Sequence, residues 1–253
     1  MKKHFTISFF LLTLFFSYNI QSDIKPWTVL TFIAGDNDLE PFIDLDLNEM
    51  KQGANTNVNV LAFVNTNRWG EQKIAKRLVI TPGQITQDGP DLLNLDSGHP
   101  DTCIQAGLWA IENYPSNKFM IIFWDHGSGS LNRFLRGTIN PWNLVADKIK
   151  RATLKDKYSK EIEKGFCYDD STGNYLTDRD LQLILDKLSQ KLGKKIDIVA
   201  FDACLMADIE LAYTAKPYAD YFVSSQEVIA GTGYQYKFVL DSLAKKDISS
   251  KNF

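Results

Sequence analysis

Two apolar stretches that end in reactive side chains decide the fold of this chain. They read FMIIFWDHGSG at residues 119–129 and KIDIVAFDAC at residues 195–204. Apolar runs of this length are typical of strands buried on both faces of a parallel sheet. The ligand crevice of such a sheet lies outside the carboxyl ends of its strands, so parallel pairing would bring His126 and Cys204 to one rim. An imidazole and a thiol at one rim are the smallest set of groups that nucleophilic catalysis by a thiol needs.

The segments around these stretches predict strands that alternate with helices. Strands are expected at 28–33, 58–64, 76–81, 118–124, 196–201 and 220–224. Helices are expected at 38–52, 101–113, 177–192 and 205–215. This alternation predicts an α/β fold with a mainly parallel sheet covered by helices on both faces. The strand at 76–81 is more polar than the others, so we expect it at an edge of the sheet.

The N-terminus predicts export. Lys2 and Lys3 precede an uncharged apolar run at 5–16, and a polar stretch follows at 17–22. This pattern is that of a signal peptide, here residues 1–22, and it predicts a periplasmic or extracellular protein. The apolar run is short for a membrane span and no cysteine follows it, so we expect no stable membrane anchor. The alternative is an uncleaved N-terminal anchor.

Length, charge and cysteine count narrow the class of protein. The chain has 253 residues and a formal net charge of −3, which suit one sizeable domain and give no basic footprint for a nucleic acid. Its three cysteines, Cys103, Cys167 and Cys204, leave at least one thiol unpaired. A disulfide between Cys103 and Cys167 would leave Cys204 free, but sequence alone does not decide that pairing.

One segment interrupts the alternation of strands and helices. Residues 131–164 have no clean periodicity and contain nine Lys and Arg residues. A connection of this length inside a domain is usually functional or flexible. The segment is therefore either a solvated basic insertion or an exposed processing site.

Cys204 is the candidate nucleophile. It is expected at a strand–helix junction, where the positive end of the following helix would favour the thiolate and its N–H groups could hold an oxyanion. The alternative is a buried structural cysteine.

His126 is the candidate acid or base. His4 lies in the leader, and His99 lies in a turn that suits a surface loop. His126 instead follows a buried strand and precedes Gly127, whose N–H could donate to a developing oxyanion. A hydrogen-bonded histidine at the rim is the alternative.

Asp202 lies two residues before Cys204, and positions two apart on a strand face the same side. A carboxylate beside a thiol raises the thiol pKa, so Asp202 is a poor activator. It suits the bottom of a pocket that binds a cationic side chain by charge-assisted hydrogen bonds. The alternative is a cap on the following helix.

The segments WDHGSG at 124–129 and FDACLMA at 201–207 resemble the clostripain family of cysteine peptidases, which belongs to the caspase-like clan. Segments at 34–39, 165–170 and 224–236 are also similar, so the resemblance extends from about residue 27 to residue 239. It implies a caspase-like three-layer α/β sandwich over residues 23–253.

The resemblance also implies an activity and its residues. His126 would act as general acid and base and Cys204 as nucleophile, with the N–H groups of Gly127 and Cys204 at the oxyanion. Asp202 would select Arg or Lys before the scissile bond of a protein or peptide substrate. Members of the family are often cut between the His and Cys segments, so the basic insertion would be the processing region. Its best candidates are Lys148, Lys150 and Arg151.

The chemistry so implied requires no cofactor, although some relatives depend on calcium. The candidate oxygen ligands lack a specific ligand spacing, so we expect capping and turn roles for them. They are Asp36, Asp38, Asp169 and Asp170. Family members commonly continue past this length, so the chain ending at Phe253 is either a minimal catalytic core or a truncated product. Two other functions stay open: a non-catalytic module that binds basic peptides, and a metal-dependent hydrolase that uses the strand-end carboxylates.

Overall fold

The computed structural model describes residues 24–68, 72–129 and 165–245. The expected leader, the basic insertion with Lys148, Lys150 and Arg151, and the chain end at Phe253 lie outside these ranges. In the described part, no helix is long and apolar enough to cross a membrane.

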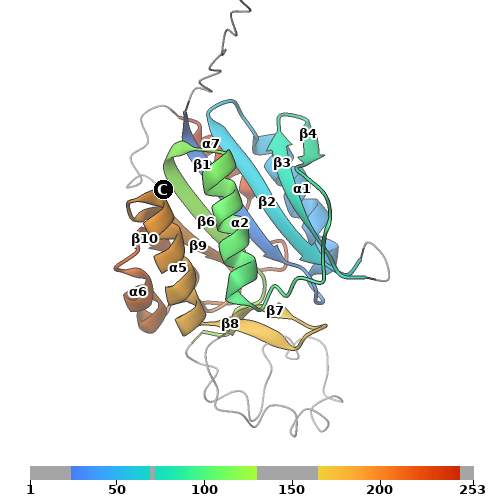
Figure 1. Ribbon diagram of the computed structural model, residues 1–253, viewed down its shortest axis with the longest axis vertical. Helices are drawn as coiled ribbons and strands as arrows, with labels where there is room; N and C mark the ends of the chain where they lie inside the picture. The colour runs from blue at the N-terminus through green and yellow to red at the C-terminus, as the bar shows by residue number, and fades with distance from the viewer. Residues whose placement is uncertain (1–23, 69–71, 130–164, 246–253) are drawn as a thin grey trace, which may run out of the picture.

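An eight-stranded sheet forms the middle layer (Figure 1). Its order is β10–β9–β6–β1–β2–β3–β4, and β5 pairs with β3. The strands are β1 Lys25–Ala34, β2 Val58–Thr66, β3 Ile74–Thr81, β4 Gln84–Gln87, β5 Leu92–Leu93, β6 Ser116–Trp124, β9 Ile196–Asp202 and β10 Ala219–Val223. The run from β10 to β2 is parallel throughout, and β3, β4 and β5 pair antiparallel. The mainly parallel sheet is therefore confirmed.

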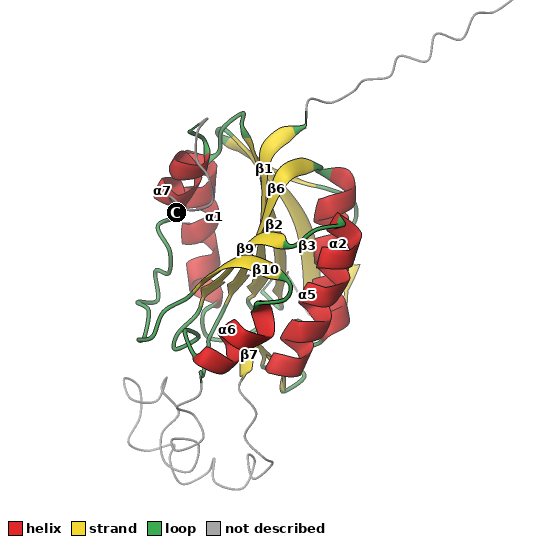
Figure 2. Ribbon diagram, turned by 90° about the vertical axis from the view of Figure 1, so that its left-hand side faces the viewer, coloured by secondary structure: helices red, strands yellow, loops and turns green. Residues whose placement is uncertain are grey.

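Helices cover both faces of this sheet (Figure 2). The helices α1 Ile43–Gly53 and α7 Tyr236–Leu243 lie on one face. The helices α2 Pro100–Asn113, α5 Asp178–Leu192 and α6 Ile209–Ala215 lie on the other. A separate hairpin of β7 Gly165–Asp169 and β8 Asn174–Thr177 lies near the end of the sheet. The expected three-layer sandwich is confirmed.

Alternation along the central strands explains their continuous apolar sequence. In β1, Leu30 and Phe32 pack in the core under α2 and α5, whereas Val29 and Ile33 pack under α1 and α7. Successive side chains face opposite layers, and because both faces are covered even the two threonines of β1, Thr28 and Thr31, are buried. The apolar run of β1 therefore identifies a central strand.

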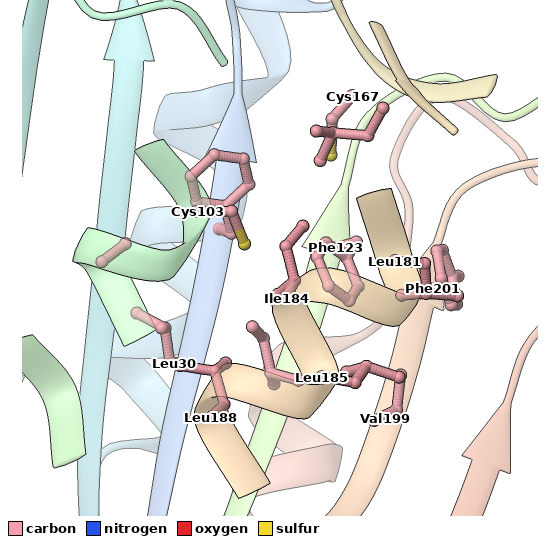
Figure 3. Close-up of a cluster of buried hydrophobic side chains, with 14 of the residues drawn as sticks. Leu30, Cys103, Phe123, Cys167, Leu181, Ile184, Leu185, Leu188, Val199 and Phe201 are labelled. Carbon is pink, nitrogen blue, oxygen red and sulfur yellow. The ribbon is translucent and has the colours of Figure 1, made fainter. Parts of the chain in front are cut away.

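The first of these cores also contains two cysteines (Figure 3). Cys103 and Cys167 are buried among apolar side chains that include Phe123 and Ile184. Both are free thiols in the structure, so the disulfide that the sequence left open is not formed here.

Three expectations about individual elements were wrong. The strand β3 is not at the edge, because β4 pairs with its outer side. The helix expected at 38–52 begins as a 3-10 turn, Glu40–Phe42, and becomes α-helical at Ile43. The helix expected directly after Cys204 begins at Ile209, because Asp208 accepts a hydrogen bond from the N–H of Leu211 and caps it there.

Candidate active site

The loops that follow β6 and β9 meet at one rim of the sheet. The two strands are parallel neighbours with Trp124 opposite Asp202, so His126 and Cys204 each lie just beyond a strand end. The N–H of Asp125 donates to the carbonyl oxygen of Asp202 at 3.2 Å. The loops touch so closely that a Cβ on Gly127 would lie 2.4 Å from the carbonyl oxygen of Cys204. The prediction that the two segments arrive at one rim is confirmed.

The thiol of Cys204 lies under a neighbouring loop. The residue is 3% exposed, and its Sγ is 3.1 Å from the nitrogen and 3.6 Å from the oxygen of Ile229. Burial raises the pKa of the Cys204 thiol and the charge of Asp202 adds to the rise, whereas the N–H of Ile229 opposes it. The resting group is therefore a thiol at neutral pH.

The expected activation of the Cys204 thiol by a helix N-terminus was also wrong. Because α6 begins at Ile209, its positive end is displaced from the sulfur. The residue after the cysteine, Leu205, instead has a φ of 62°. A bulky residue in the left-handed region is uncommon, and such strain gathers at functional sites.

His126 is paired with a carboxylate that the sequence did not single out for this role. Its Nε2 lies 2.5 Å from Oδ1 of Asp38, and the imidazole is almost fully buried. This contact is the main cause that holds the pKa of Asp38 below its usual range. The parallel pairing of β1 and β6 could have predicted it, because Asp38 follows the end of β1 at the same rim.

Asp125 and Ser128 fasten the histidine loop to the hairpin. The buried carboxylate of Asp125 accepts hydrogen bonds from Nδ2 of Asn37 at 2.8 Å and from the N–H of Tyr168. Ser128 donates through its N–H and its hydroxyl to the carbonyl oxygen of Gly165, at 3.1 and 3.0 Å. Burial raises the pKa of Asp125 to about 7. The hairpin, which the sequence did not predict, thus holds the histidine loop in place.

Asp202 lies on the face of the sheet covered by α1 and α7. It is 5% exposed, and its Oδ2 accepts hydrogen bonds from the N–H of Tyr234 and the hydroxyl of Tyr236, both at 2.9 Å. Burial raises the pKa of Asp202 to about 6, although both hydrogen bonds favour the charged form. Asp208, not Asp202, caps the following helix, so the capping alternative for Asp202 was wrong.

The remaining acidic residues of the rim have structural partners. Lys73 forms ion pairs with Asp36 at 3.0 Å and with Asp169, and Asp169 also accepts from the hydroxyl of Ser97. The N–H of Asp170 donates to the carbonyl oxygen of Asp36. Within the described ranges, no group of three or more His, Cys, Asp or Glu residues is arranged to hold a metal ion.

His99 behaves as a residue of a surface turn. Its Nδ1 accepts a hydrogen bond from the N–H of Asp101 and so caps α2, with the side chain 55% exposed. It lies at the start of α2 and has no place in the pair formed by the two loops.

Comparisons of the sequence with known proteins identify its family. The model of the clostripain family matches residues 31–135 and 151–252. The chain is 26% identical to clostripain of Hathewaya histolytica over 244 residues, which are 85% of this chain and 42% of that protein.

Solved structures agree as well. A secreted C11 cysteine protease from Bacteroides thetaiotaomicron, in complex with an irreversible peptide inhibitor, has a TM-score of 0.62 and 26% identity. The match covers 88% of this chain and 55% of that one. An inactive zymogen C11 protease from Parabacteroides distasonis, at 22% identity and a TM-score of 0.57, agrees in fold.

The chain thus spans about half the length of the relatives it matches. The family match covers most of the sequence and includes both loops of the rim. The three-layer sandwich is that of the C11 proteases, which is the caspase-like fold that the sequence predicted. The chain belongs to the clostripain family.

Proposed function

We propose that this chain is a cysteine endopeptidase that cleaves after Arg or Lys, with Cys204 as nucleophile and His126 as general acid and base. The observation that carries the proposal is the contact between the two loops, in which Gly127 lies against the backbone of Cys204. A thiol, an imidazole and a glycine N–H within one rim are what acyl transfer requires.

The reaction follows from these groups. The Cys204 sulfur attacks the carbonyl carbon of the scissile bond, and the N–H groups of Gly127 and Cys204 stabilise the oxyanion. The thiol proton passes to His126 and from there to the leaving amine, so that a thioester remains. Water then attacks the thioester carbonyl, and His126 takes a proton from this water and passes it to the departing sulfur, so that the carboxylic acid is released and the thiol is restored. Because burial keeps the resting Cys204 protonated, we expect proton loss to accompany attack.

Asp202 supports the preference for basic side chains. Its carboxylate is buried two residues before the nucleophile, and the two tyrosine hydrogen bonds meet at Oδ2. Oδ1 takes part in neither of these bonds. A guanidinium or ammonium group that reached the carboxylate would neutralise a charge that burial now disfavours.

The basic insertion would be a site of self-processing at Lys148, Lys150 or Arg151. Gly127 and Phe166 form a β-bridge, and Ser128 and Gly165 exchange hydrogen bonds, so the residues on either side of the insertion are joined. A cut between them would leave both fragments in one fold. Residues 1–22 would direct export and be removed. Mass spectrometry of the secreted protein tests both cuts.

A panel of Arg-, Lys- and Asp-amide reporters tests the proposed activity. The unmodified chain should hydrolyse the Arg and Lys reporters only, and Cys204→Ala should lower kcat/KM by at least about 1,000-fold. Activity should survive a chelator and be lost on thiol alkylation, since the chemistry needs no cofactor; loss in chelator with recovery in calcium would show calcium dependence.

Other outcomes favour the other functions. Full activity in Cys204→Ala would contradict the mechanism, and loss in chelator with survival of alkylation would favour the metal-dependent hydrolase. Binding of basic peptides without turnover would favour the non-catalytic module.

A further inference from the structure

The contact between His126 and Asp38 crosses from one strand end to another. Asp38 lies in the loop after β1, and its Oδ1 is 2.5 Å from Nε2 of His126. We propose that Asp38 is a positioning residue for His126, which holds the imidazole in one orientation. The proposal rests on the proposed function, in which His126 exchanges a proton with the substrate.

The backbone around Asp38 is fixed by its neighbour Asn37. The amide Nδ2 of Asn37 donates to the carbonyl oxygen of Ala34 at 2.9 Å and to Asp125 at 2.8 Å. The Oδ1 of Asn37 accepts from the N–H of Leu39 at 3.0 Å. Since Asn37 precedes Asp38 and Asp125 precedes His126, this amide ties the two loops together directly beside the carboxylate–imidazole pair.

Local structure does not require the carboxylate of Asp38. The 3-10 turn begins at Glu40 and α1 at Ile43, and neither start receives a hydrogen bond from a capping side chain. The turn bond of this loop comes from Asn37. Asp38 therefore caps neither element, and its carboxylate contacts the imidazole and its own backbone N–H.

The charge of Asp38 suits this role. The hydrogen bond to His126 lowers the pKa of Asp38, so the carboxylate is ionised throughout the neutral range. Asp125 and Asp170 also interact electrostatically with His126, but burial raises the pKa of each. Asp36 and Asp38 raise that of Asp170 further. Nε2 therefore faces an ionised acceptor, which favours a ring that carries a proton on this nitrogen.

Kinetics of matched variants test the proposal. Asp38→Asn keeps an oxygen acceptor but loses the charge, and because the Asp38 side chain is 74% exposed, the variant should keep the fold. We expect kcat to fall about 10- to 100-fold with KM within about threefold, since part of the acid–base contribution is lost.

The control is Asp44→Asn, because Asp44 is similarly exposed on α1 and pairs with Arg68. Its kcat should stay within about twofold of the unmodified chain. Asp38→Ala opens an accessible space for a small carboxylate, so formate should restore part of its kcat and chloride should not. Rescue by formate would not occur if Asp38 only stabilised the loop.

A measurement that needs no turnover separates this proposal from the proposed function. In a Cys204→Ala background, NMR of the His126 ring nitrogens shows which of them carries the proton of the neutral ring, in chains with and without Asp38→Asn. The proton should lie on Nε2 when Asp38 is present and should be shared between the two nitrogens in Asp38→Asn, whereas Asp44→Asn should leave the pattern unchanged. An unchanged pattern in Asp38→Asn, or an unchanged kcat in an active chain, would overturn the positioning role. Absence of peptidase activity beside a changed pattern would overturn only the proposed function.

Discussion

The preference for basic side chains should depend on pH through Asp202. Burial raises the pKa of this carboxyl to about 6, and only the ionised form attracts a guanidinium. With that value, about nine-tenths of the groups are ionised at pH 7 and about one-tenth at pH 5. The ratio of kcat/KM for an Arg reporter to that for its uncharged citrulline analogue should therefore fall about tenfold from pH 7 to pH 5.

The ratio isolates Asp202 from the other titrating groups. Changes at His126, Cys204 or Asp125 alter both substrates alike and cancel, and kcat/KM reports the free enzyme. In Asp202→Asn the ratio should be low and independent of pH. A ratio that stays constant between pH 5 and pH 7 in the unmodified chain would refute the assignment of Asp202.

Three further predictions concern the packing and charge of the site. Gly127→Ala should abolish turnover and lower the free energy of unfolding in urea by about 1–3 kcal/mol, because the new Cβ would lie 2.4 Å from the carbonyl oxygen of Cys204. Unchanged kinetics would contradict this and would show that the two loops separate freely. Gly233→Ala should reduce the Arg preference, because its Cβ would lie 2.5 Å from Oδ2 of Asp202 at a φ of +59°, and retained selectivity in the reporter panel would contradict this. Burial raises the pKa of Asp46 to about 7, so the unmodified chain loses stability as the pH rises from 4 to 7 and this carboxyl ionises. The free energy of unfolding of Asp46→Asn minus that of the unmodified chain, measured by denaturant titration, should therefore increase by about 1–3 kcal/mol from pH 5 to pH 8. An equal difference at both pH values would argue against a buried charge.

The sequence predicts the central sheet well because its signal is local. Apolar runs such as those of β1 and β6 report burial on both faces, and the capping box of Thr177 and Asp180 marks the start of α5. The rule that ligands bind at the carboxyl ends of parallel strands then brings His126 and Cys204 together. Each of these inferences rests on patterns within single segments and on a general rule about parallel sheets.

What the sequence did not predict depends on contacts between distant segments. The hairpin of β7 and β8 is short, and its position is fixed by Asp125 and Ser128 across the insertion. The delay of α6 to Ile209 follows from pairing of the cysteine loop with residues near Glu227, whose carbonyl oxygen accepts from the N–H of Leu205. The cover over the Cys204 sulfur comes from Ile229 and has no signal near Cys204 itself.

Covalent labelling of the nucleophile tests the central claim most directly. A chloromethyl ketone that carries Arg at its reactive end should alkylate the folded, mature chain, and peptide mapping by mass spectrometry should find the adduct on Cys204. Arg-containing peptide should slow the reaction, while His126→Ala should slow it further and Cys204→Ala should abolish it. An adduct on Cys103 or Cys167, or labelling that is indifferent to Arg, would contradict the account.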